Sequence, residues 1–479
     1  MVRITIDRNS PETGYKQVYR RLREAILTGE LVSGARLPST RILAGEAGVA
    51  RVTISRAYEQ LAAEGFVESR VGAGTYVAAK IPTIAEAKAT EFKPVLTNWG
   101  QRAIALTRQA ERGGDGGRPE IDFGFGRSFA ERFPYDVWRR LLGRYLSTDD
   151  AMLSRYGSAA GFYPLRQAVA DYLVRARGVR CTPEDVVIVS GAQQAIDILA
   201  RLLINAGDEV LIETPGYRDA FALFRLHQAR LVGLSVDNQG LPVDDIPLGC
   251  QAKLAFVTPS HQFPKGGTMP LVRRLALLAW ARKHSAIIIE DDYDGDLRYE
   301  GDSLSALEGL DEDGRVIYLG TFSKVLFPAL RLGYLVLPRT LVAPFVRAKE
   351  LVDRGAPTLT QAAVADFLSE GHFERHLRHL RQLYGEKRVA LVTALDEYLG
   401  DRVRFSPVAA GLHVMIYANT PIDEAGLAHS AAALGVRVYG GAPYHLERPA
   451  PPSFLLGFSG LSESEIVEGV RRLAAAWPE

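Results

Sequence analysis

Apolar residues recur every three or four positions over the first 65 residues, a spacing that is typical of amphipathic helices. The pattern predicts a first helix over 14–28, a second that Ser39 can cap and Gly48 ends, and a third over 50–64. Two β-prone runs follow, at 66–69 and 75–77, with a glycine-containing turn between them. Two short helices joined by a glycine turn form a helix-turn-helix, and the hairpin behind it would be a wing.

Farther along the chain, short apolar runs that are typical of buried strands alternate with helical patterns. Strands are expected at 186–189, 209–212, 254–257, 287–289, 316–319 and 332–337, with helices at 192–205, 216–228 and 270–284. This alternation predicts a mainly parallel sheet with helices on both faces. A long helical stretch is then expected over 359–398, before a smaller α+β part with strands at 413–417 and 454–458.

The stretch between these two patterns has no steady apolar period and includes the glycine-rich run Gly113–Gly117. Such a segment is typical of a linker, here with one helix near 99–111. We therefore divide the chain into a first domain over 1–80, a linker over 81–120 and a second domain over 121–479. The smaller part of the second domain is expected to begin at about residue 345.

Composition narrows the class of protein. With 47% hydrophobic and 24% charged residues, the 479-residue chain is close to the globular average, which argues against a disordered or fibrous protein. Its two cysteines, Cys181 and Cys250, cannot form a disulfide framework. The start MVRITIDRN contains no apolar run, and no stretch approaches the roughly 18 apolar residues of a membrane helix. We therefore expect a cytoplasmic protein with no membrane partner.

Basic residues are concentrated near the N-terminus, where the first 80 residues contain 12 Lys or Arg and 8 Asp or Glu. The third helix begins with arginines and hydroxyls, at the place where a recognition helix presents side chains to base edges. The start of the second helix suits a phosphate, and the hairpin glycines would let the wing approach the DNA backbone. The predicted DNA-binding residues are Ser39, Thr40, Arg41, Arg51, Thr53, Ser55, Arg56, Gly72 and Gly74.

The run LPSTRILAGEAGVARVTISRAYEQLAAEGFVESRVGAGTYV closely resembles the winged helix of GntR-type bacterial transcription regulators, and the resemblance covers residues 14–78. The elements LPS-x-R, GV-x-R-x-T, AY-x-x-L and GFVESR-x-G-x-GT-x-V occur in order and at the expected spacing. This resemblance implies a double-stranded DNA operator as partner.

Polar groups follow several of the expected parallel strands, at the edge where open α/β sheets bind ligands. After 186–189, a glycine turn opens a helix and presents N–H groups suited to a phosphate. Carboxylates and the Tyr293 phenol follow 287–289, and hydroxyls and the Lys324 amine follow 316–319. A lysine in a cleft can have a lowered pKa and form a Schiff base. Together these groups are typical of a pyridoxal phosphate site.

From about residue 120 onward, the chain resembles the fold-type I aminotransferases. The whole chain resembles the MocR/GabR family, in which a GntR-like winged helix is fused to an aminotransferase-like domain. The matching motifs are TPSHQFP at 258–264, EDDYD at 290–294 and GTFSK-x-x-x-P-x-x-R-x-GY at 320–334. The resemblance implies a winged helix-turn-helix followed by an α/β fold-type I transferase-like domain with a smaller C-terminal α+β subdomain.

The same resemblance implies pyridoxal 5′-phosphate as cofactor and a role for each site residue. Lys324 would form the Schiff base, Asp291 would face the ring nitrogen, and Tyr293 would reach the ring hydroxyl. Tyr217 would stack on the ring. The phosphate would be bound by Thr321, Ser323, Arg331 and the turn Gly191, Ala192 and Gln193.

Two positions depart from the aminotransferase pattern. Phe263 stands where many aminotransferases have an asparagine that bonds the ring oxygen, although phenylalanine also suits the regulator family. Leu455 occupies the position of the arginine that usually binds the substrate carboxylate, and its loss would weaken amino-acid binding. Arg218 or Arg448 could replace that arginine.

Our leading hypothesis is a transcription regulator that senses an amine or vitamin B6 through the lysine-bound cofactor. Candidate effectors are pyridoxal phosphate itself, γ-aminobutyrate, taurine, a dipeptide or another amine. The family resemblance implies a homodimer, with the winged helices swapped between subunits in some members. The alternative is a working aminotransferase with an accessory DNA-binding domain, and a dimeriser without cofactor is a third hypothesis.

Four histidines, His261, His372, His376 and His379, would be candidates for metal ligands. Because the sequence shows no clear carboxylate or cysteine partner for them, we interpret them as part of a solvated helix face. No metal is predicted.

Overall fold

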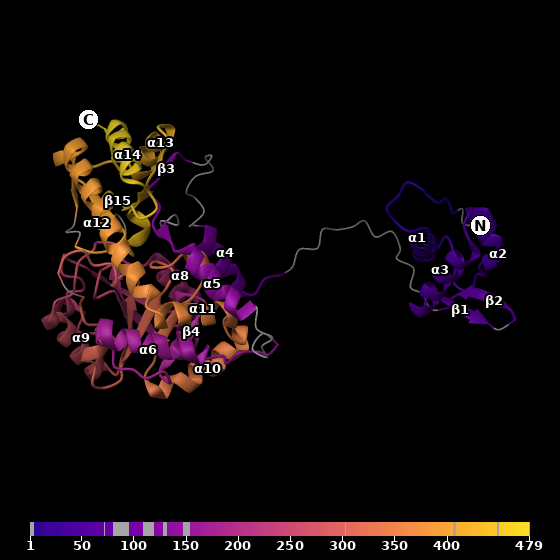
Figure 1. Cartoon of the computed structure of the whole chain (residues 1–479), viewed down its shortest axis with the longest axis horizontal. Coiled ribbons are helices and arrows are strands. Elements are labelled where there is room, and N and C mark those ends of the chain that lie inside the picture. Colours follow the sequence, from indigo (N-terminus) through magenta and orange to yellow (C-terminus); the bar gives the residue numbers. More distant parts are fainter. Residues whose placement is uncertain are drawn as a thin grey trace. The chain divides into compact units, whose positions relative to one another are not determined.

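The computed structural model describes residues 4–70, 72–79, 95–108, 119–127, 132–146, 154–301, 303–405, 409–447 and 450–478. Backbone contacts divide the chain into two compact units, Met1–Leu96 and Thr97–Glu479 (Figure 1). Most of the expected linker, including the Gly113–Gly117 run, lies outside the described residues. Its expected helix corresponds to α4 (Asn98–Arg108), which packs against α8 (Arg218–Leu226).

The first unit is a helix-turn-helix with a hairpin, as the sequence predicts. Its elements are α1 (Gly14–Leu27), α2 (Thr40–Ala47), α3 (Arg51–Ala63), β1 (Val67–Arg70) and β2 (Gly74–Val77). The Ser39 hydroxyl accepts a hydrogen bond from the Ile42 N–H at 3.3 Å, and Gly48 ends α2 with φ of 65°. Val18, Leu22, Ile54 and Leu61 are almost fully buried and form the core that fixes the three helices.

The second unit is built on a seven-stranded sheet with the order β4-β10-β9-β8-β7-β5-β6. All neighbouring strands are parallel except β10, which is antiparallel to both β4 and β9. The strands are β4 (Val186–Val189), β5 (Glu209–Thr214), β6 (Arg230–Ser235), β7 (Leu254–Val257), β8 (Ile287–Asp292), β9 (Val316–Thr321) and β10 (Gly333–Val336). The predicted mainly parallel sheet is therefore confirmed.

Helices cover both faces of this sheet because its strands are apolar on both sides. Val187 and Val189 pack with α7 (Ala192–Leu203), α8 and α10 (Arg339–Asp353) on one face. Val186 and Ile188 point the other way and pack with α5 (Tyr135–Leu146), α6 (Tyr163–Arg177) and α11 (Thr358–Ser369). On that same side of the sheet, α9 (Leu271–His284) packs against Leu211 and Ala255.

The helical stretch expected over 359–398 is confirmed, and the chain divides it into two helices near Gly371. That glycine has φ of 73° and separates α11 from α12 (His372–Tyr398). The long helix α12 then runs from the large sheet to the C-terminal subdomain and packs against α14 (Glu463–Ala476) (Figure 1).

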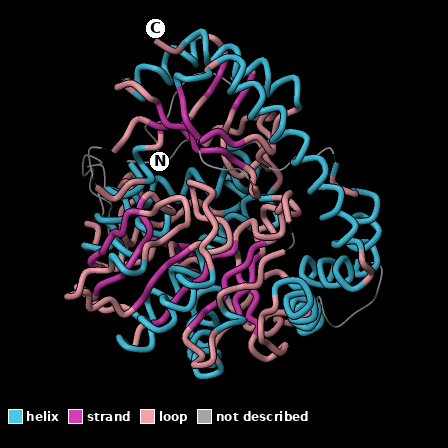
Figure 2. The backbone as a smooth tube through the Cα atoms, turned by 90° about the vertical axis from the view of Figure 1, so that its left-hand side faces the viewer, coloured by secondary structure: helices cyan, strands magenta, loops and turns pink. Residues whose placement is uncertain are grey.

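A second, smaller sheet forms the C-terminal subdomain and is separate from the large sheet (Figure 2). Its order is β11-β12-β15-β14, with β11 (Val403–Phe405), β12 (His413–Ala418), β14 (Tyr439–Gly440) and β15 (Ser453–Gly457). Helix α13 (Glu424–Ala433) joins it, and β13 (Val436–Arg437) pairs with β3 (Ile121–Asp122). No helix in the described part of the chain is long and apolar enough to cross a membrane.

A buried ion pair fixes the end of β8 next to α6. The Arg177 guanidinium lies 2.6 Å from the Asp292 carboxylate, and both side chains are at most 3% exposed. The same carboxylate oxygen, Oδ2, also accepts a hydrogen bond from the Tyr318 hydroxyl, whereas Oδ1 is buried without a hydrogen-bond partner among the described residues.

We expect Arg177→Met to lower the free energy of unfolding of the second unit by about 3–5 kcal/mol, because Asp292 would stay buried without its partner. Chemical denaturation measures this loss. The matched control is Arg175→Met, which removes an arginine that is 64% exposed and should change little. Equal effects of the two substitutions would contradict the assignment.

Candidate functional site

One cavity of about 410 Å³ collects all ten residues predicted to bind the cofactor. It lies at the carboxyl edge of the large sheet, where the ends of β4, β8 and β9 meet residues of the small subdomain. The lining residues include Gly191, Ala192, Gln193, Tyr217, Asp291, Tyr293, Thr321, Ser323, Lys324 and Arg331. Residues that are up to 140 positions apart along the chain are thereby brought to one site.

Strand ends position these side chains as the sequence suggests, with one correction. Strand β8 runs on to Asp292 instead of ending at Ile289, so Asp291 lies inside the strand. Its backbone pairs with Leu319 of β9, and this pairing fixes the carboxyl group relative to the run that carries Lys324.

The turn between β4 and α7 forms one end of the cavity. Gly191 has φ of 91° and precedes the first residue of α7, so the positive end of that helix faces the site. The Arg331 guanidinium donates a hydrogen bond to the Ser190 carbonyl at 3.2 Å. A Cβ at Gly191 would lie only 3.4 Å from that guanidinium. This end of the cavity therefore combines N–H donors and a cation, which suits a phosphate.

Lys324 is the amine of the cavity. Burial lowers the pKa of this lysine, while the nearby Asp294 and Asp291 carboxyls oppose that shift. Its Nζ lies 4.1 Å from the centre of the Phe125 ring, and a Cβ at Gly126 would be 2.9 Å from it. A lowered pKa increases the fraction of neutral amine, which is the nucleophilic form.

Asp291 is a buried carboxyl that is 6% exposed. Burial, together with the neighbouring Asp292 and Asp294, raises its pKa to about 8. Such a group gains most from a cationic partner placed next to it, because the partner compensates the cost of burying the charge. A protonated ring nitrogen would be a partner of this kind.

A histidine that the sequence analysis assigned to a solvated face belongs to this site. His261 is 3% exposed, and its Nδ1 lies 2.8 Å from the Tyr293 hydroxyl and 2.9 Å from the Asp294 carboxylate. The expectation of a solvated histidine without a carboxylate partner is therefore wrong. The sequence carried a signal for this contact: the motifs TPSHQFP and EDDYD lie at the ends of β7 and β8, which are neighbouring parallel strands.

Aromatic and apolar side chains close the remaining walls. Gln193 donates a hydrogen bond to the Tyr217 hydroxyl at 2.8 Å. Phe263 contacts the Tyr217 and Tyr293 rings edge to face, with centroids 6.0 and 5.6 Å apart. Leu455 is 1% exposed and lines the cavity at the position expected for a carboxylate-binding arginine.

Two arginines besides Arg331 line the described part of the cavity. Arg218 lines it from the start of α8, whereas Arg448 lies outside the described residues. Arg127, which the sequence analysis missed, also lines it and forms an ion pair with Asp122 at 2.6 Å. Of the two arginines that could replace the carboxylate-binding arginine, Arg218 is therefore the one that the structure places at the cavity.

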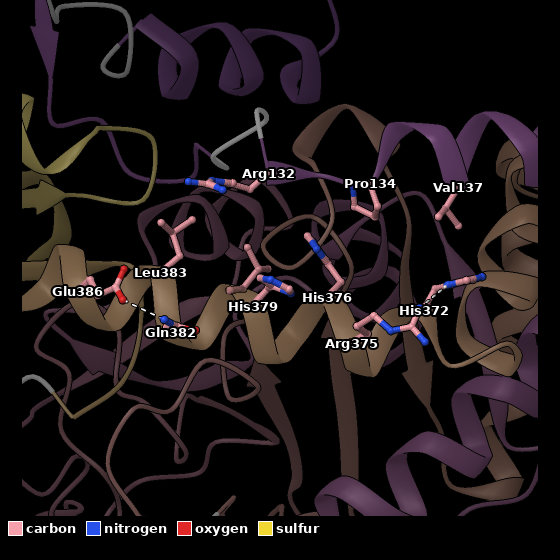
Figure 3. A pocket seen from close by; sticks show the side chains of 11 residues that line it. Arg132, Pro134, Val137, His372, Arg375, His376, His379, Gln382, Leu383 and Glu386 are labelled. Atoms are coloured by element: carbon pink, nitrogen blue, oxygen red, sulfur yellow. Dashed lines mark hydrogen bonds between the residues drawn. The ribbon is translucent and has the colours of Figure 1, made fainter.

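The other three histidines lie along the first half of α12 and line a separate pocket with Arg132 and Arg375 (Figure 3). His376 is 6% exposed and forms a hydrogen bond with the Val325 carbonyl at 2.9 Å. A solvated face is therefore wrong for His376. Among the described residues, no group of three His, Cys, Asp or Glu side chains is arranged to bind a metal ion.

The predicted DNA-binding residues of the first unit lie mainly on the starts of α2 and α3. Arg41, Arg51 and Arg56 are exposed, and the Arg51 guanidinium donates to the Thr40 hydroxyl at 3.1 Å. Ser39 caps α2, Ser55 is half-buried, and Gly72 and Gly74 have φ of 75° and 114° in the hairpin.

Two details of that surface differ from the expectation. Thr53 is half-buried and turns its methyl group towards α1, where it would be 3.7 Å from a Cβ on Gly14. Val52, which is 72% exposed on α3, was missed although an exposed branched apolar residue can contact a thymine methyl. Arg36 was missed as well, and a Cβ on Gly74 would lie 3.0 Å from its Nε.

The cavity around Lys324 fits pyridoxal 5′-phosphate. Its lining provides an amine with a lowered pKa, a buried carboxyl group and a phenol. Its end around Gly191 and Arg331 is suited to bind a phosphate. Gly126 has φ of 91°, which favours glycine, and lets the backbone approach the Lys324 amine closely.

Comparison with known proteins agrees with both halves of this description. The family model of bacterial regulatory proteins of the gntR family matches residues 14–77, and the model of class I and II aminotransferases matches residues 126–473. The probable rhizopine catabolism regulatory protein MocR of Rhizobium meliloti is 37% identical over 99% of this chain and 96% of that protein. The transcriptional regulator TauR of Rhodobacter capsulatus is 31% identical over 95% of this chain and 94% of its own length.

The second unit also resembles solved aminotransferases. LysN, an α-aminoadipate aminotransferase of Thermus thermophilus solved with N-(5′-phosphopyridoxyl)-L-leucine, is 29% identical with a TM-score of 0.73 and covers 80% of this chain and 96% of its own. The kynurenine aminotransferase of Pyrococcus horikoshii is 28% identical with a TM-score of 0.71, and the match covers 82% of this chain and 96% of that protein. The chain therefore belongs to the MocR-type transcription regulators, which join a GntR winged helix to a pyridoxal-phosphate-dependent aminotransferase domain.

Proposed function

We propose that this regulator senses a primary amine, or vitamin B6 itself, at Lys324 and converts that event into a change in operator binding. The observation that carries the proposal is the cavity in which Lys324, Asp291 and Tyr293 lie together while Leu455 replaces the carboxylate-binding arginine. Such a site retains the groups that bind the cofactor and lacks one that aminotransferase turnover relies on for positioning.

Each residue has a proposed role. When bound, pyridoxal 5′-phosphate supplies an electrophilic carbon that an amine can attack. Lys324 would provide the resident amine, Asp291 would face the ring nitrogen, and Tyr293, held by His261 and Asp294, would bond the ring hydroxyl. Tyr217 would pack on the ring. The phosphate would be bound by Thr321, Ser323, Arg331 and the turn Gly191, Ala192 and Gln193.

The effector amine would compete with the Lys324 amine within the cofactor cavity. Because the cavity lies between the large sheet and the small subdomain, we propose that the freed lysine changes how these two parts pack. A ligand can shift that equilibrium only if it binds the two arrangements with different affinity. The sensing step therefore predicts operator affinity that depends on amine concentration.

We further propose a homodimer that acts in the cytoplasm on a paired operator. Large apolar side chains are exposed on the second unit near the end of α10, where Leu351 is 90% and Val352 is 49% exposed. Tyr156, 83% exposed, lies beside them, with the Arg354 guanidinium 5.4 Å from its ring centre. Exposed apolar groups of this kind are typical of an interface.

Titration of primary amines and amino acids into the cofactor-loaded protein tests the sensing role. We expect at least one amine to change the visible spectrum and the operator affinity together, with little keto acid released. Steady keto-acid production with unchanged operator affinity would instead indicate an enzyme.

Arg218 should set the preference for effectors that carry a carboxylate. We expect Arg218→Met to weaken the spectral response to γ-aminobutyrate by about tenfold, since a hydrogen-bonded carboxylate contact contributes roughly 1.5–3 kcal/mol. The response to the uncharged-tail amine propylamine should stay within about twofold. Arg225→Met, on the same helix, is the matched control. If the two amines lose affinity equally, Arg218 does not bind the carboxylate.

A further inference from the structure

A second cavity, of about 470 Å³, opens between the large sheet and the small subdomain and shares no lining residue with the cofactor cavity. The large sheet contributes Thr214 and Ser235, the last residues of the parallel strands β5 and β6. The small sheet contributes Arg404 of β11 and Tyr417 of β12. This is again the carboxyl edge of parallel strands, where open α/β sheets bind ligands.

Two cations face this cavity without a carboxylate partner. The Lys265 ammonium donates to the Val236 carbonyl at 2.9 Å, which uses one of its three N–H groups. Within the described residues, neither Lys265 nor Arg404 forms an ion pair, and the nearby Asp237 pairs with Arg273 at 2.6 Å. Burial lowers the pKa of Lys265, and Arg404 adds to that shift while Asp237 opposes it. The two cations therefore repel each other across the cavity. Among the described residues that line the cavity, Glu447 alone carries a carboxylate.

A buried hydroxyl without a described hydrogen-bond partner, that of Tyr417, belongs to a residue that lines the same cavity. Tyr417 is 8% exposed, and its hydroxyl oxygen is buried with no hydrogen-bond partner among the described residues. The strand register sets Tyr417 directly opposite Arg404, whose guanidinium lies 5.2 Å from the centre of the tyrosine ring. Burial raises the pKa of Tyr417 to about 12, so the phenol is a neutral donor at physiological pH. A buried donor without a partner is unfavourable and gains from any acceptor that enters.

We propose that this cavity binds a small anion, a carboxylate or phosphate group, between Lys265, Arg404 and the Tyr417 hydroxyl. The donors come from both sides of the cleft, so a bound anion would link the loop after β7 to β11 and β12 of the small subdomain. Such a link stabilises the arrangement of the two parts in which the donors converge. The regulator would then have a second effector site whose occupation needs no reaction at Lys324.

Calorimetric titration of the full-length, cofactor-loaded protein tests the proposal, with inorganic phosphate and succinate as separate probes. We expect saturable binding of at least one probe, and the probe that binds identifies the group as phosphate or carboxylate. The double variant Lys265→Met/Arg404→Met should bind at least about tenfold more weakly, and Tyr417→Phe several-fold more weakly. Arg378→Met, which removes an exposed arginine of α12, should change affinity by less than about twofold.

The visible spectrum of the cofactor should stay constant throughout the titration, which separates this site from the cofactor cavity. If the double variant fails to fold, the single variant Arg404→Gln at an exposed position replaces it. Absence of saturation by both probes would overturn the proposal. So would binding that the double variant keeps and that Arg331→Met removes, because the anion would then occupy the phosphate end of the cofactor cavity.

Discussion

Replacing Lys324 by alanine is expected to abolish covalent attachment of the cofactor to the chain and, with it, the response of operator affinity to amines. Among the described residues that line the cavity, Lys324 is the single lysine. Burial disfavours its ammonium form. The remaining groups, Asp291 and the phosphate end around Gly191, would still bind the cofactor without a bond to the chain. The visible band of the wild-type protein and the label left after borohydride reduction measure the attachment.

Lys283→Ala is the control, because Lys283 is exposed on α9 away from the cavity. It should keep the band and the label unchanged. A Lys324→Ala protein that retained the borohydride-stable label would contradict the assignment and indicate another lysine. A wild-type protein that takes up no cofactor would contradict the sensing proposal itself.

The largest effect on DNA binding is expected for the double variant Arg51→Ala/Arg56→Ala. Both arginines are exposed on the first two turns of α3, the second helix of the helix-turn-helix, which we expect to enter the major groove. One bidentate contact to a base contributes roughly 1–3 kcal/mol, so two contacts predict at least about a 30-fold loss of operator affinity. The measurement uses an operator selected from random DNA by the wild-type protein, and the ratio of specific to non-specific affinity is compared.

Arg20→Ala controls for loss of charge alone, since Arg20 is 67% exposed on α1. This variant should weaken specific and non-specific binding alike, because phosphate contacts carry no sequence information. If Arg51→Ala/Arg56→Ala lowers both affinities in equal proportion, the two arginines contact phosphates and another residue reads the bases. The exposed Val52 would then be the next candidate.

Local sequence signals predicted most of the site because its residues follow parallel strands. Lys324 and Arg331 lie just after β9, and the glycine turn at 191 lies just after β4, so the carboxyl edge brings them together. Strand β6 was not predicted, because it is an edge strand whose residues are mostly half-exposed and carry no buried apolar run. The break at Gly371 does not show in the apolar spacing, which continues on both sides of it.

Contacts between distant segments could not be predicted from spacing. His261 meets Asp294 across 33 residues, and only the pairing of β7 with β8 brings their loops together. Lys265 and Arg404 line one cavity because the small sheet packs next to the ends of β5 and β6. Periodicity indicates which face of an element is buried, but it does not indicate which other element covers that face.

The most direct test of the account follows the visible spectrum and the operator affinity on the same samples while an amine is added. It uses cofactor-loaded wild-type protein and Lys324→Ala, with γ-aminobutyrate, taurine and pyridoxal phosphate as separate titrants. The account predicts that one titrant changes both signals with the same midpoint in the wild-type protein, and that no titrant changes the operator affinity of Lys324→Ala. Operator affinity that responds equally in both proteins, or a spectral change in the wild-type protein that leaves its operator affinity untouched, would contradict it.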